Sequence, residues 1–442
     1  MNRLLAFFEN CLMPAFVSFA DNRYIRAVRD AFITYTLPMI IAGSFFLILA
    51  FPPIPPHSEQ PFFQSIQQWA VTYRPMLSIP FTFSFGLMAV WVAFGTAVRL
   101  AEIYNLPGFR SGLTAIAALL IFSIPVGIYD QLSSIPLSKM LDNLGGKGLF
   151  VAIFTAIATV EITRWLYARK LIFQLPPAVP PAISRSFESI IPTTFVLSAA
   201  WLLEWFVSAT FSSAGEPMTM PLLVMKVFEP LVRASDTYPA ALLQIFLMMS
   251  LWSVGIHGMN LVSAAAYPFW STNLAENVAV ASAAPGTVLP HIVTEPFFHI
   301  YAHLGGSGAT LPLVFFLLRS RSSQLRQIGK LSLVPAIFNI NEPVTFGVPI
   351  AFNPLMSIPF ILAPAVIVTI NYAAMALDLV PKPLLQLPFT MPIPLSGMLS
   401  VQHWSGAVLQ LFDVLVAAAI YYPFFVLWEK NMTQKENTDS SS

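Results

Sequence analysis

One carboxylate stands out in this sequence because it lies in a polar segment between two apolar runs. Glu342 belongs to the segment 339–343 (NINEP), and the flanking runs 331–338 and 344–364 carry no charged side chain. Ionisable side chains at membrane depth are costly and usually mark a substrate or ion pathway. The neighbouring Asn339 and Asn341 add donors and acceptors that suit a polyhydroxyl ligand. We therefore favour a functional Glu342 over a carboxylate that only caps a helix or pairs with an arginine.

A histidine at the end of another apolar run is the second candidate. His257 is followed by Gly258, which lets the backbone approach closely or unwind around the imidazole. A lone histidine on an apolar segment is more often structural, so His257 gains weight only with a partner such as Glu342. Trp252 and Phe389 have rings that could stack on a sugar, although single aromatic residues in membrane spans usually serve packing.

Three further histidines suggest a metal site at first sight. His291, His299 and His303 are separated by multiples of four residues, a spacing that would place them on one helix face together with Glu295. Two prolines in this stretch argue against one regular helix, so we favour an interfacial hairpin and expect no metal. The glycine run 305–308 lacks the Gly-Lys-Ser/Thr ending of a phosphate loop and predicts a turn before the next span. No cofactor is expected.

Two other carboxylates lie inside apolar runs. Glu161 has Arg164 three residues later, which permits a local ion pair, and we interpret Glu161 as structural. Glu204 has no obvious partner in the sequence, so its role stays open.

Composition sets the class of protein. The chain has 442 residues, of which 56% are hydrophobic and 10% charged, against roughly 25% charged in soluble domains. This predicts an integral membrane protein without a separate soluble domain. The net charge of +1 gives no support for nucleic-acid binding. A single cysteine, Cys11, excludes a disulfide within the chain and paired thiolate metal sites. Charges interrupt the N-terminus before any long apolar core, so no cleavable signal peptide is expected.

The apolar runs predict an all-α polytopic membrane protein with about ten transmembrane helices plus re-entrant hairpins. Proline and histidine interrupt two segments of the second half, 285–304 and 386–400, and interrupted segments are where transporters place binding sites. The apolar runs lie near 31–51, 76–98, 111–129, 149–167, 189–211, 240–256, 308–318, 344–377 and 405–428.

Lysine and arginine in the loops predict the orientation. With the N-terminus inside and five alternating spans in the first half, only Arg74, Lys139 and Lys147 of that half fall outside. Both termini are then cytoplasmic. The predicted parts are a cytoplasmic amphipathic segment (1–30), an N-terminal five-helix half (31–211), an amphipathic connector (212–239), a C-terminal half with hairpins (240–430) and a disordered tail (431–442).

Several motifs together resemble the membrane-embedded EIIC (permease IIC) component of the lactose/cellobiose family of the phosphoenolpyruvate-dependent sugar phosphotransferase system. The resemblance covers nearly the whole chain, and its most specific part is the Asn-Glu-Pro segment with its flanks. The motifs are the segments 26–32 (RAVRDAF), 255–258 (GIHG), 305–311 (GGSGATL), 337–344 (IFNINEPV) and 359–364 (PFILAP).

The resemblance implies a homodimer in the bacterial cytoplasmic membrane. Its N-terminal half would make much of the dimer contact and its C-terminal hairpins would hold the sugar. It further implies that Glu342 and His257 bind the C6 hydroxyl of a β-linked, cellobiose-type disaccharide, with Glu342 the better candidate to take the proton. Asn341 would fix the sugar and Trp252 would form an apolar wall. The remaining contacts would come from Gly258, Asn339 and Phe389, and Phe389 stands where the family favours a tryptophan.

The phosphoryl group would come from separate chains. The resemblance implies a phosphocysteine on a IIB protein, which is charged by a phosphohistidine on a IIA protein, so this chain would be the membrane subunit of a sugar phosphotransferase. Cys11 lacks a glycine- and serine-rich phosphate cradle and is not that donor. The alternative is a cation-coupled secondary transporter, in which Glu342 and His257 relay protons and unmodified sugar is delivered. An intramembrane enzyme acting on lipid is weaker, because no nucleophile or metal set is complete. Cellobiose, diacetylchitobiose, lactose and β-mannosides stay open as substrates.

Overall fold

The computed structural model describes most of the chain as helices and connecting segments, with no strand among the described residues. It divides into two compact units. Unit 1 consists of Met1–Gly43 and Ile79–Val232, and unit 2 of Ser44–Ser78 and Arg233–Ser442. The assignment of dimer contact to the N-terminal half and of the sugar site to the C-terminal half stays a prediction. The described residues are 22–50, 52, 60–124, 141, 143–176, 179–212, 218–253, 258–284, 286–348, 350 and 353–439.

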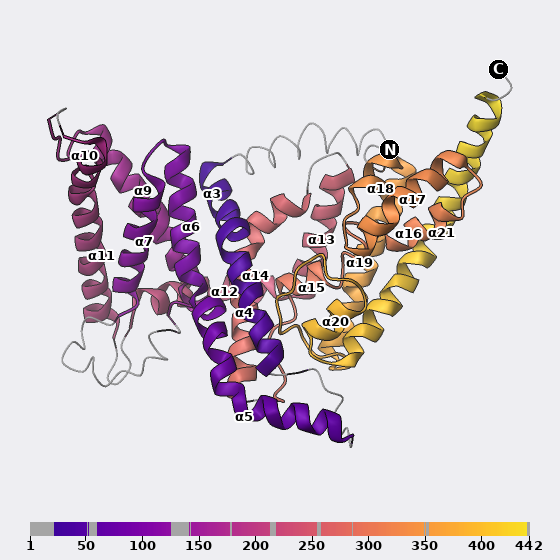
Figure 1. Ribbon diagram of the computed structural model, residues 1–442, viewed down its shortest axis with the longest axis horizontal. Helices are drawn as coiled ribbons and strands as arrows, with labels where there is room; N and C mark the ends of the chain where they lie inside the picture. The colour runs from indigo at the N-terminus through magenta and orange to yellow at the C-terminus, as the bar shows by residue number, and fades with distance from the viewer. Residues whose placement is uncertain are drawn as a thin grey trace. The chain divides into compact units, whose positions relative to one another are not determined.

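Unit 1 is built around helix α6 (Met88–Ile103). This helix packs against α3 (Arg23–Ala31), α7 (Gly108–Phe122) and α9 (Leu149–Ala168), and α7 also contacts α11 (Ile190–Phe211) (Figure 1). A row of buried alanines four residues apart on α6 lets these helices approach closely; the row is Ala89, Ala93, Ala97 and Ala101. The other elements are the π-helix η2 (Phe32–Thr36), the 3₁₀ turns η3 (Phe85–Leu87) and η5 (Gly146–Gly148), and helices α10 (Pro181–Glu188) and α12 (Met220–Ser235).

Glu161 and Glu204, the two carboxylates that the sequence places inside apolar runs of unit 1, have structural partners. The predicted local ion pair is present, with Arg164 Nη1 3.0 Å from Glu161. Glu161 also accepts hydrogen bonds from the hydroxyls of Tyr104 and Tyr24, which tie α3 and the end of α6 to α9. Glu204 is fully buried, and its Oε2 accepts a hydrogen bond of 3.0 Å from the backbone N–H of Met220, the first residue of α12. It therefore satisfies an open donor at a helix start.

Unit 2 holds the second half of the chain. Helix α19 (Pro354–Ala376) packs against α13 (Tyr238–Ser253) and α21 (Trp404–Asp439), while α16 (Leu311–Leu318) packs against α17 (Ser323–Ile337) and α21 (Figure 1). Helix α14 (Gly258–Ala283) and the short helices α15 (Glu295–His299), α18 (Glu342–Gly347) and α20 (Leu395–Ser400) complete this unit. The boundaries of the units fall within α4 (Leu37–Ala50), α5 (Pro61–Ser84) and α12, whose last three residues belong to unit 2.

The interrupted segments of unit 2 depend on side chains of α21. Gln410 Nε2 donates to the Ile300 carbonyl at 2.7 Å, and Gln410 Oε1 accepts from the Gly397 N–H at 2.8 Å. The Tyr421 hydroxyl donates to the Gly308 carbonyl at 2.7 Å. Irregular backbone at membrane depth requires such partners because no bulk water is present there. The two segments predicted to be broken thus contain only short helices, α15 and α20, whereas their re-entrant placement in a bilayer stays a prediction.

Six helical stretches among the described residues are long and apolar enough to cross a membrane. Two shorter apolar helices, α7 and α13, match the runs predicted near 111–129 and 240–256. The six stretches are 23–50, 61–103, 146–168, 183–211, 355–376 and 404–434. The total of about ten spans stays a prediction.

Helix α21 continues to Asp439, so the segment predicted as a disordered tail is helical to that residue. Near this end, Glu436 accepts hydrogen bonds from the start of α17.

We predict that Gly308→Ala destabilises the protein more than Gly286→Ala. Both glycines have left-handed backbone, with φ of 83° and 87°, which costs alanine about 1 kcal/mol. A Cβ at Gly308 would lie 2.2 Å from the Phe360 ring, whereas nothing lies within 4 Å of one at Gly286. The overlap adds about 1–3 kcal/mol. Thermal unfolding of the purified protein in detergent checks this, and equal losses for the two variants would contradict it.

Candidate functional site

Asn339 connects three segments of unit 2 at the end of α17. Its backbone is left-handed, with φ of 59°, a conformation that asparagine tolerates better than most residues. Its Oδ1 accepts the N–H of Gly305 at 2.8 Å, and its Nδ2 donates to the carbonyls of Phe389 at 2.7 Å and Met391 at 3.2 Å. The amide is thus engaged with backbone, and it fixes the glycine turn and the segment around Phe389 beside the Asn-Glu-Pro segment.

Asn341 makes a second link to the same turn. This buried residue precedes α18, and its Nδ2 donates to the Ser307 carbonyl. Gly306 has φ of 100°, and a Cβ there would lie 2.6 Å from the Asn341 side chain. The predicted turn over 305–308 is therefore present. Position 306 requires glycine because its backbone is left-handed and because the Asn341 side chain leaves no room for a Cβ.

Glu342 is the first residue of α18 and its side chain is exposed. Within the described part of the chain, no hydrogen bond or ion pair engages its carboxylate. A carboxylate that accepts a proton from a ligand has to be accessible in this way. Phe389, whose carbonyl is bonded to Asn339, has a side chain that is 52% exposed.

The predicted residues of α13 and α14 lie at the adjoining ends of these helices. Trp252 is buried near the end of α13, and Gly258 begins α14, where a Cβ would lie 2.0 Å from a carbonyl oxygen of α13. His257 lies outside the described residues. Met259, the residue after Gly258, has its sulfur 3.3 Å from His299 Nε2. The start of α14 is therefore next to α15, whose following turn contacts Asn339 and Asn341.

Two of the three histidines of this region lie together, since the rings of His299 and His303 are edge to face with centroids 5.9 Å apart, whereas His291 has other partners. His299 Nδ1 lies 3.2 Å from the Glu295 carboxylate, and His303 Nδ1 lies 2.7 Å from the Phe298 carbonyl. His291 faces two other carboxylates. Among the described residues, no group of three or more His, Cys, Asp or Glu side chains is arranged to hold a metal ion.

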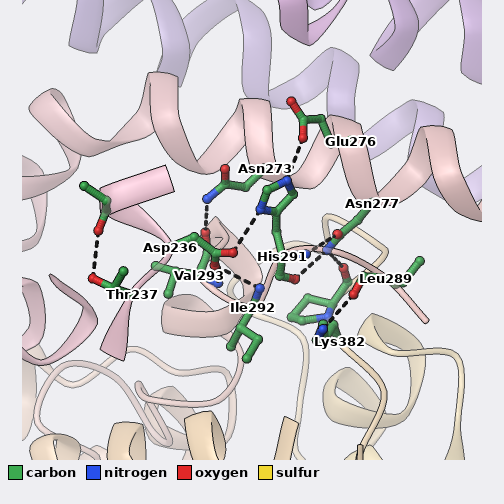
Figure 2. Close-up of polar contacts among 12 residues, drawn as sticks. Asp236, Thr237, Asn273, Glu276, Asn277, Leu289, His291, Ile292, Val293 and Lys382 are labelled. Atoms are coloured by element: carbon green, nitrogen blue, oxygen red, sulfur yellow. Dashed lines mark hydrogen bonds and ion pairs between the residues drawn. The ribbon is translucent and has the colours of Figure 1, made fainter. Parts of the chain in front are cut away.

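His291 is the centre of the polar cluster in Figure 2, which joins Asp236, Glu276 and the segment 289–293. Its Nδ1 lies 2.9 Å from Asp236 Oδ2 and its Nε2 2.6 Å from Glu276 Oε2. Asp236 Oδ1 also accepts the backbone N–H groups of residues 292 and 293 at 2.9 and 2.6 Å. Because both ring nitrogens face carboxylates, both donate, and the ring is an imidazolium. The cluster fixes the segment before α15.

Two further side chains extend this cluster to the segment after α19. Asn277 Nδ2 donates to the carbonyls of His291 at 2.8 Å and Pro383 at 2.9 Å, and its Oδ1 accepts the His291 N–H at 2.9 Å. Lys382 Nζ donates to the Leu289 carbonyl at 2.7 Å (Figure 2). The segment 289–293 is thus held from three directions.

The cluster shifts the titration of His291. Burial opposes the positive charge, but hydrogen bonds with Asp236 and Glu276 outweigh it and raise the pKa of His291 to about 9. The folded pKa lies above the unfolded value of about 6.5. The cluster therefore stabilises the fold fully below that value and loses its contribution as pH rises through the folded pKa.

The sequence profile described as "Phosphotransferase system, EIIC" matches residues 29–364, which contain the glycine turn, both asparagines that bind it, Glu342 and His291 with its two carboxylate partners. The chain belongs to the EIIC family. It is a multi-pass membrane protein of the lactose/cellobiose branch, as the motifs predict. Its assignment as a permease component of a sugar phosphotransferase system, which works with a sugar and with IIA and IIB components, follows from the family.

Relatives match this EIIC over nearly its full length. It is 38% identical to the lichenan permease IIC component of Bacillus subtilis, covering 99% of this chain and 96% of the relative. It is 37% identical to the cellobiose-specific EIIC component of Geobacillus stearothermophilus, covering 99% and 97%. The crystal structure of the transporter ChbC, the IIC component of the N,N'-diacetylchitobiose-specific system, matches with a TM-score of 0.86 and 35% identity over 98% of this chain and 99% of ChbC.

Sequence reasoning missed how this EIIC holds the segment before α15. Asp236 and His291 are 55 residues apart, and no local pattern links them. A usable signal was the number of polar residues in 273–277, since a helix in a membrane protein carries asparagines and glutamates only where they have partners.

We predict that replacing the imidazolium removes a pH-dependent part of the stability. His291→Gln cannot carry the charge, so it lowers the free energy of unfolding at pH 6.5 by on the order of 2–3 kcal/mol. Between about pH 6.5 and 9.5 the wild-type melting temperature falls more steeply than that of the variant. Thermal unfolding across this range checks the prediction.

His403→Gln is the matched control, because His403 Nδ1 contacts the Ser405 hydroxyl at 2.7 Å and no carboxylate of the described residues forms an ion pair with His403. This variant keeps the wild-type pH dependence. Parallel pH curves for wild type and His291→Gln would overturn the assignment of the imidazolium.

Proposed function

We propose that this EIIC binds a β-linked disaccharide of the cellobiose type and translocates it while a separate phospho-IIB protein phosphorylates the sugar C6 hydroxyl. The observation that carries the proposal is the exposed Glu342 carboxylate at the start of α18, directly after Asn339 and Asn341, which bind the glycine turn. Relatives named for lichenan and cellobiose, and the ChbC structure, support the substrate class.

In the proposed reaction Glu342 takes the proton of the sugar C6 hydroxyl, and the hydroxyl oxygen attacks the phosphorus of phospho-IIB. The bond between phosphorus and the IIB cysteine sulfur breaks, and a bond between phosphorus and the sugar oxygen forms. Such transfer depends on an oriented nucleophile and on charge stabilisation more than on covalent chemistry by the protein. His257 orients the hydroxyl together with Glu342.

The proposed binding residues have different tasks. Asn341 keeps its Oδ1 for the sugar, since its Nδ2 is bonded to Ser307. Trp252 forms an apolar wall, and Gly258 lets the chain approach the ligand. Phe389 lies at the rim, and Asn339 shapes the site through the backbone that it holds. All of these residues belong to unit 2.

Phosphorylation makes uptake one-way. A sugar phosphate carries charge, which Glu342 repels and which the apolar core of the membrane excludes. The proposed assembly is a homodimer in the bacterial cytoplasmic membrane, with about ten spans and cytoplasmic termini. IIA and phospho-IIB then act at the cytoplasmic face, where the phosphoryl group is available.

We predict that Glu342→Gln abolishes sugar phosphorylation but retains sugar binding. Loss of the general base costs about 100-fold or more in transfer rate, whereas the amide keeps a hydrogen bond to the hydroxyl. The measurement is uptake of radiolabelled cellobiose in cells that express this EIIC with its cognate IIA and IIB, with the internal label separated into free and phosphorylated sugar.

Asp378→Asn is the control for that experiment. Asp378 is an exposed carboxylate of the same unit with φ of 54°, a conformation that asparagine also adopts. This variant phosphorylates sugar at the wild-type rate. Accumulation of free sugar without IIB would instead identify a cation-coupled transporter, and full activity of Glu342→Gln would exclude Glu342 as the base.

A further inference from the structure

Unit 1 contains a polar pocket that the proposed transfer reaction does not use. The start of α7, the end of α9 and the start of α11 line it, and these three helices pack against one another (Figure 1). Apart from two prolines, every lining residue carries a hydroxyl or a guanidinium group. The pocket encloses about 230 Å³ of empty space, part of which is open to solvent. Pockets for whole organic ligands occupy about 300–1,000 Å³, so this one suits a single small group.

Arg110 supplies the positive charge of this pocket. Its Nη1 donates to the Arg185 carbonyl, and its Nη2 lies 3.4 Å from the Ser186 hydroxyl. A guanidinium has five N–H donors, so three of them are left for a ligand. Among the described residues, no carboxylate forms an ion pair with Arg110. The acid of this region, Glu188, accepts from the Ser184 hydroxyl at 3.3 Å instead.

Hydroxyl groups form the rest of the pocket wall. Those of Ser111 and Thr163 donate to backbone carbonyls at 3.1 and 2.7 Å, and those of Thr114 and Thr193 lie 3.1 Å apart. Tyr167 differs, because no hydrogen bond engages its hydroxyl within the described part of the chain. Its side chain is half-buried and lines the pocket. The tyrosine hydroxyl and the arginine are therefore the open donors, and two open donors with one positive charge suit an anionic oxygen ligand.

The helix ends around the pocket indicate where it lies relative to lipid. Helices α9 and α11 belong to the stretches 146–168 and 183–211, which are long and apolar enough to cross a membrane, and the pocket is near one end of each. Two exposed basic residues, Arg169 and Lys170, directly follow α9. The orientation predicted from the basic residues places this end at the cytoplasmic side, where anionic lipids give the membrane a negative surface. An anionic head group is therefore within reach of the pocket.

We propose that this pocket binds the phosphate group of an anionic phospholipid, with Arg110 and Tyr167 as its donors. Basic pockets between membrane helices commonly bind such head groups, and a guanidinium gives a phosphate two parallel N–H bonds. Free phosphate has the same charge, but the exposed apolar side chains of Phe109 and Ile190, next in sequence to pocket residues, favour a ligand with acyl chains. The bound lipid joins α7 to α9 and stabilises unit 1. This proposal does not rest on the sugar transfer reaction.

The first test measures the affinity of the full-length protein for phosphatidylglycerol, by native mass spectrometry of the detergent-purified protein. Arg110→Gln weakens binding of the tightest lipid about fivefold or more, the loss expected for one basic residue that faces an anionic head group. Arg26→Gln is the matched control, because Arg26 is an exposed arginine of unit 1 that does not line the pocket. It removes the same charge and keeps the wild-type affinity. Equal affinities for the two variants would show only general attraction to the lipid and would overturn the proposed site.

A second variant keeps the test sound if Arg110→Gln folds poorly. Arg110 also holds the backbone of α10 through the Arg185 carbonyl, whereas the Tyr167 hydroxyl bonds to no described residue. Tyr167→Phe therefore leaves the melting temperature in lipid-free detergent unchanged. It weakens phosphatidylglycerol binding about three- to tenfold, because one hydrogen bond to the phosphate is lost. Wild-type lipid affinity of Tyr167→Phe would contradict the assignment of this hydroxyl as a donor.

Thermal unfolding separates the lipid from free phosphate. Phosphatidylglycerol in excess over its Kd raises the wild-type melting temperature by a few degrees, because it binds the folded state alone. Phosphatidylcholine, whose ammonium group offsets the phosphate charge, raises it less, and millimolar inorganic phosphate leaves it unchanged. A full shift with inorganic phosphate would assign the pocket to the free anion and overturn the lipid proposal. A phosphatidylglycerol shift of the same size in wild type and Arg110→Gln would place the stabilising lipid elsewhere and overturn it as well.

Discussion

The rest of unit 2 depends on one constraint, which is that irregular backbone buried inside the protein must find its hydrogen-bond partners within the protein. Water is not available to satisfy these groups, and each unsatisfied group costs several kcal/mol. The chain meets the constraint with side chains from distant helices. Gln410 and Tyr421 of α21 bond the turn after α15 and the start of α20, while Asn277 and Asp236 bond the segment before α15.

Satisfying this backbone also builds the candidate site. The amides of Asn339 and Asn341 bind the glycine turn from one side, and the Glu342 carboxylate is then presented from the start of a short helix with no engagement by the described residues. A loop that was free to move would not hold a base within reach of a hydroxyl, because transfer rates fall steeply with misplacement. The polar residues around the glycine turn thus serve as support, whereas the proposed function gives the chemical role to the Glu342 carboxylate.

Local patterns in the sequence predicted much of this arrangement. Apolar runs indicated the long helices, the glycine run indicated a turn, and the spacing of Glu161 and Arg164 indicated their ion pair. The partners of Glu204 and His291 could not be predicted, because they come from residues distant along the chain and depend on how the helices pack. The extension of α21 to Asp439 was missed for the same reason: Glu436 contacts the start of α17, and a polar composition alone does not reveal that contact.

The most direct test of the account follows the phosphoryl group itself. Vesicles that contain purified EIIC are supplied with radiolabelled phospho-IIB and either cellobiose or its analogue that lacks the C6 hydroxyl on the non-reducing sugar. The account predicts that label moves from IIB to cellobiose only when EIIC is present, and that the deoxy analogue binds without being labelled. Labelling of the deoxy analogue, or uptake of unmodified cellobiose without IIB, would contradict it.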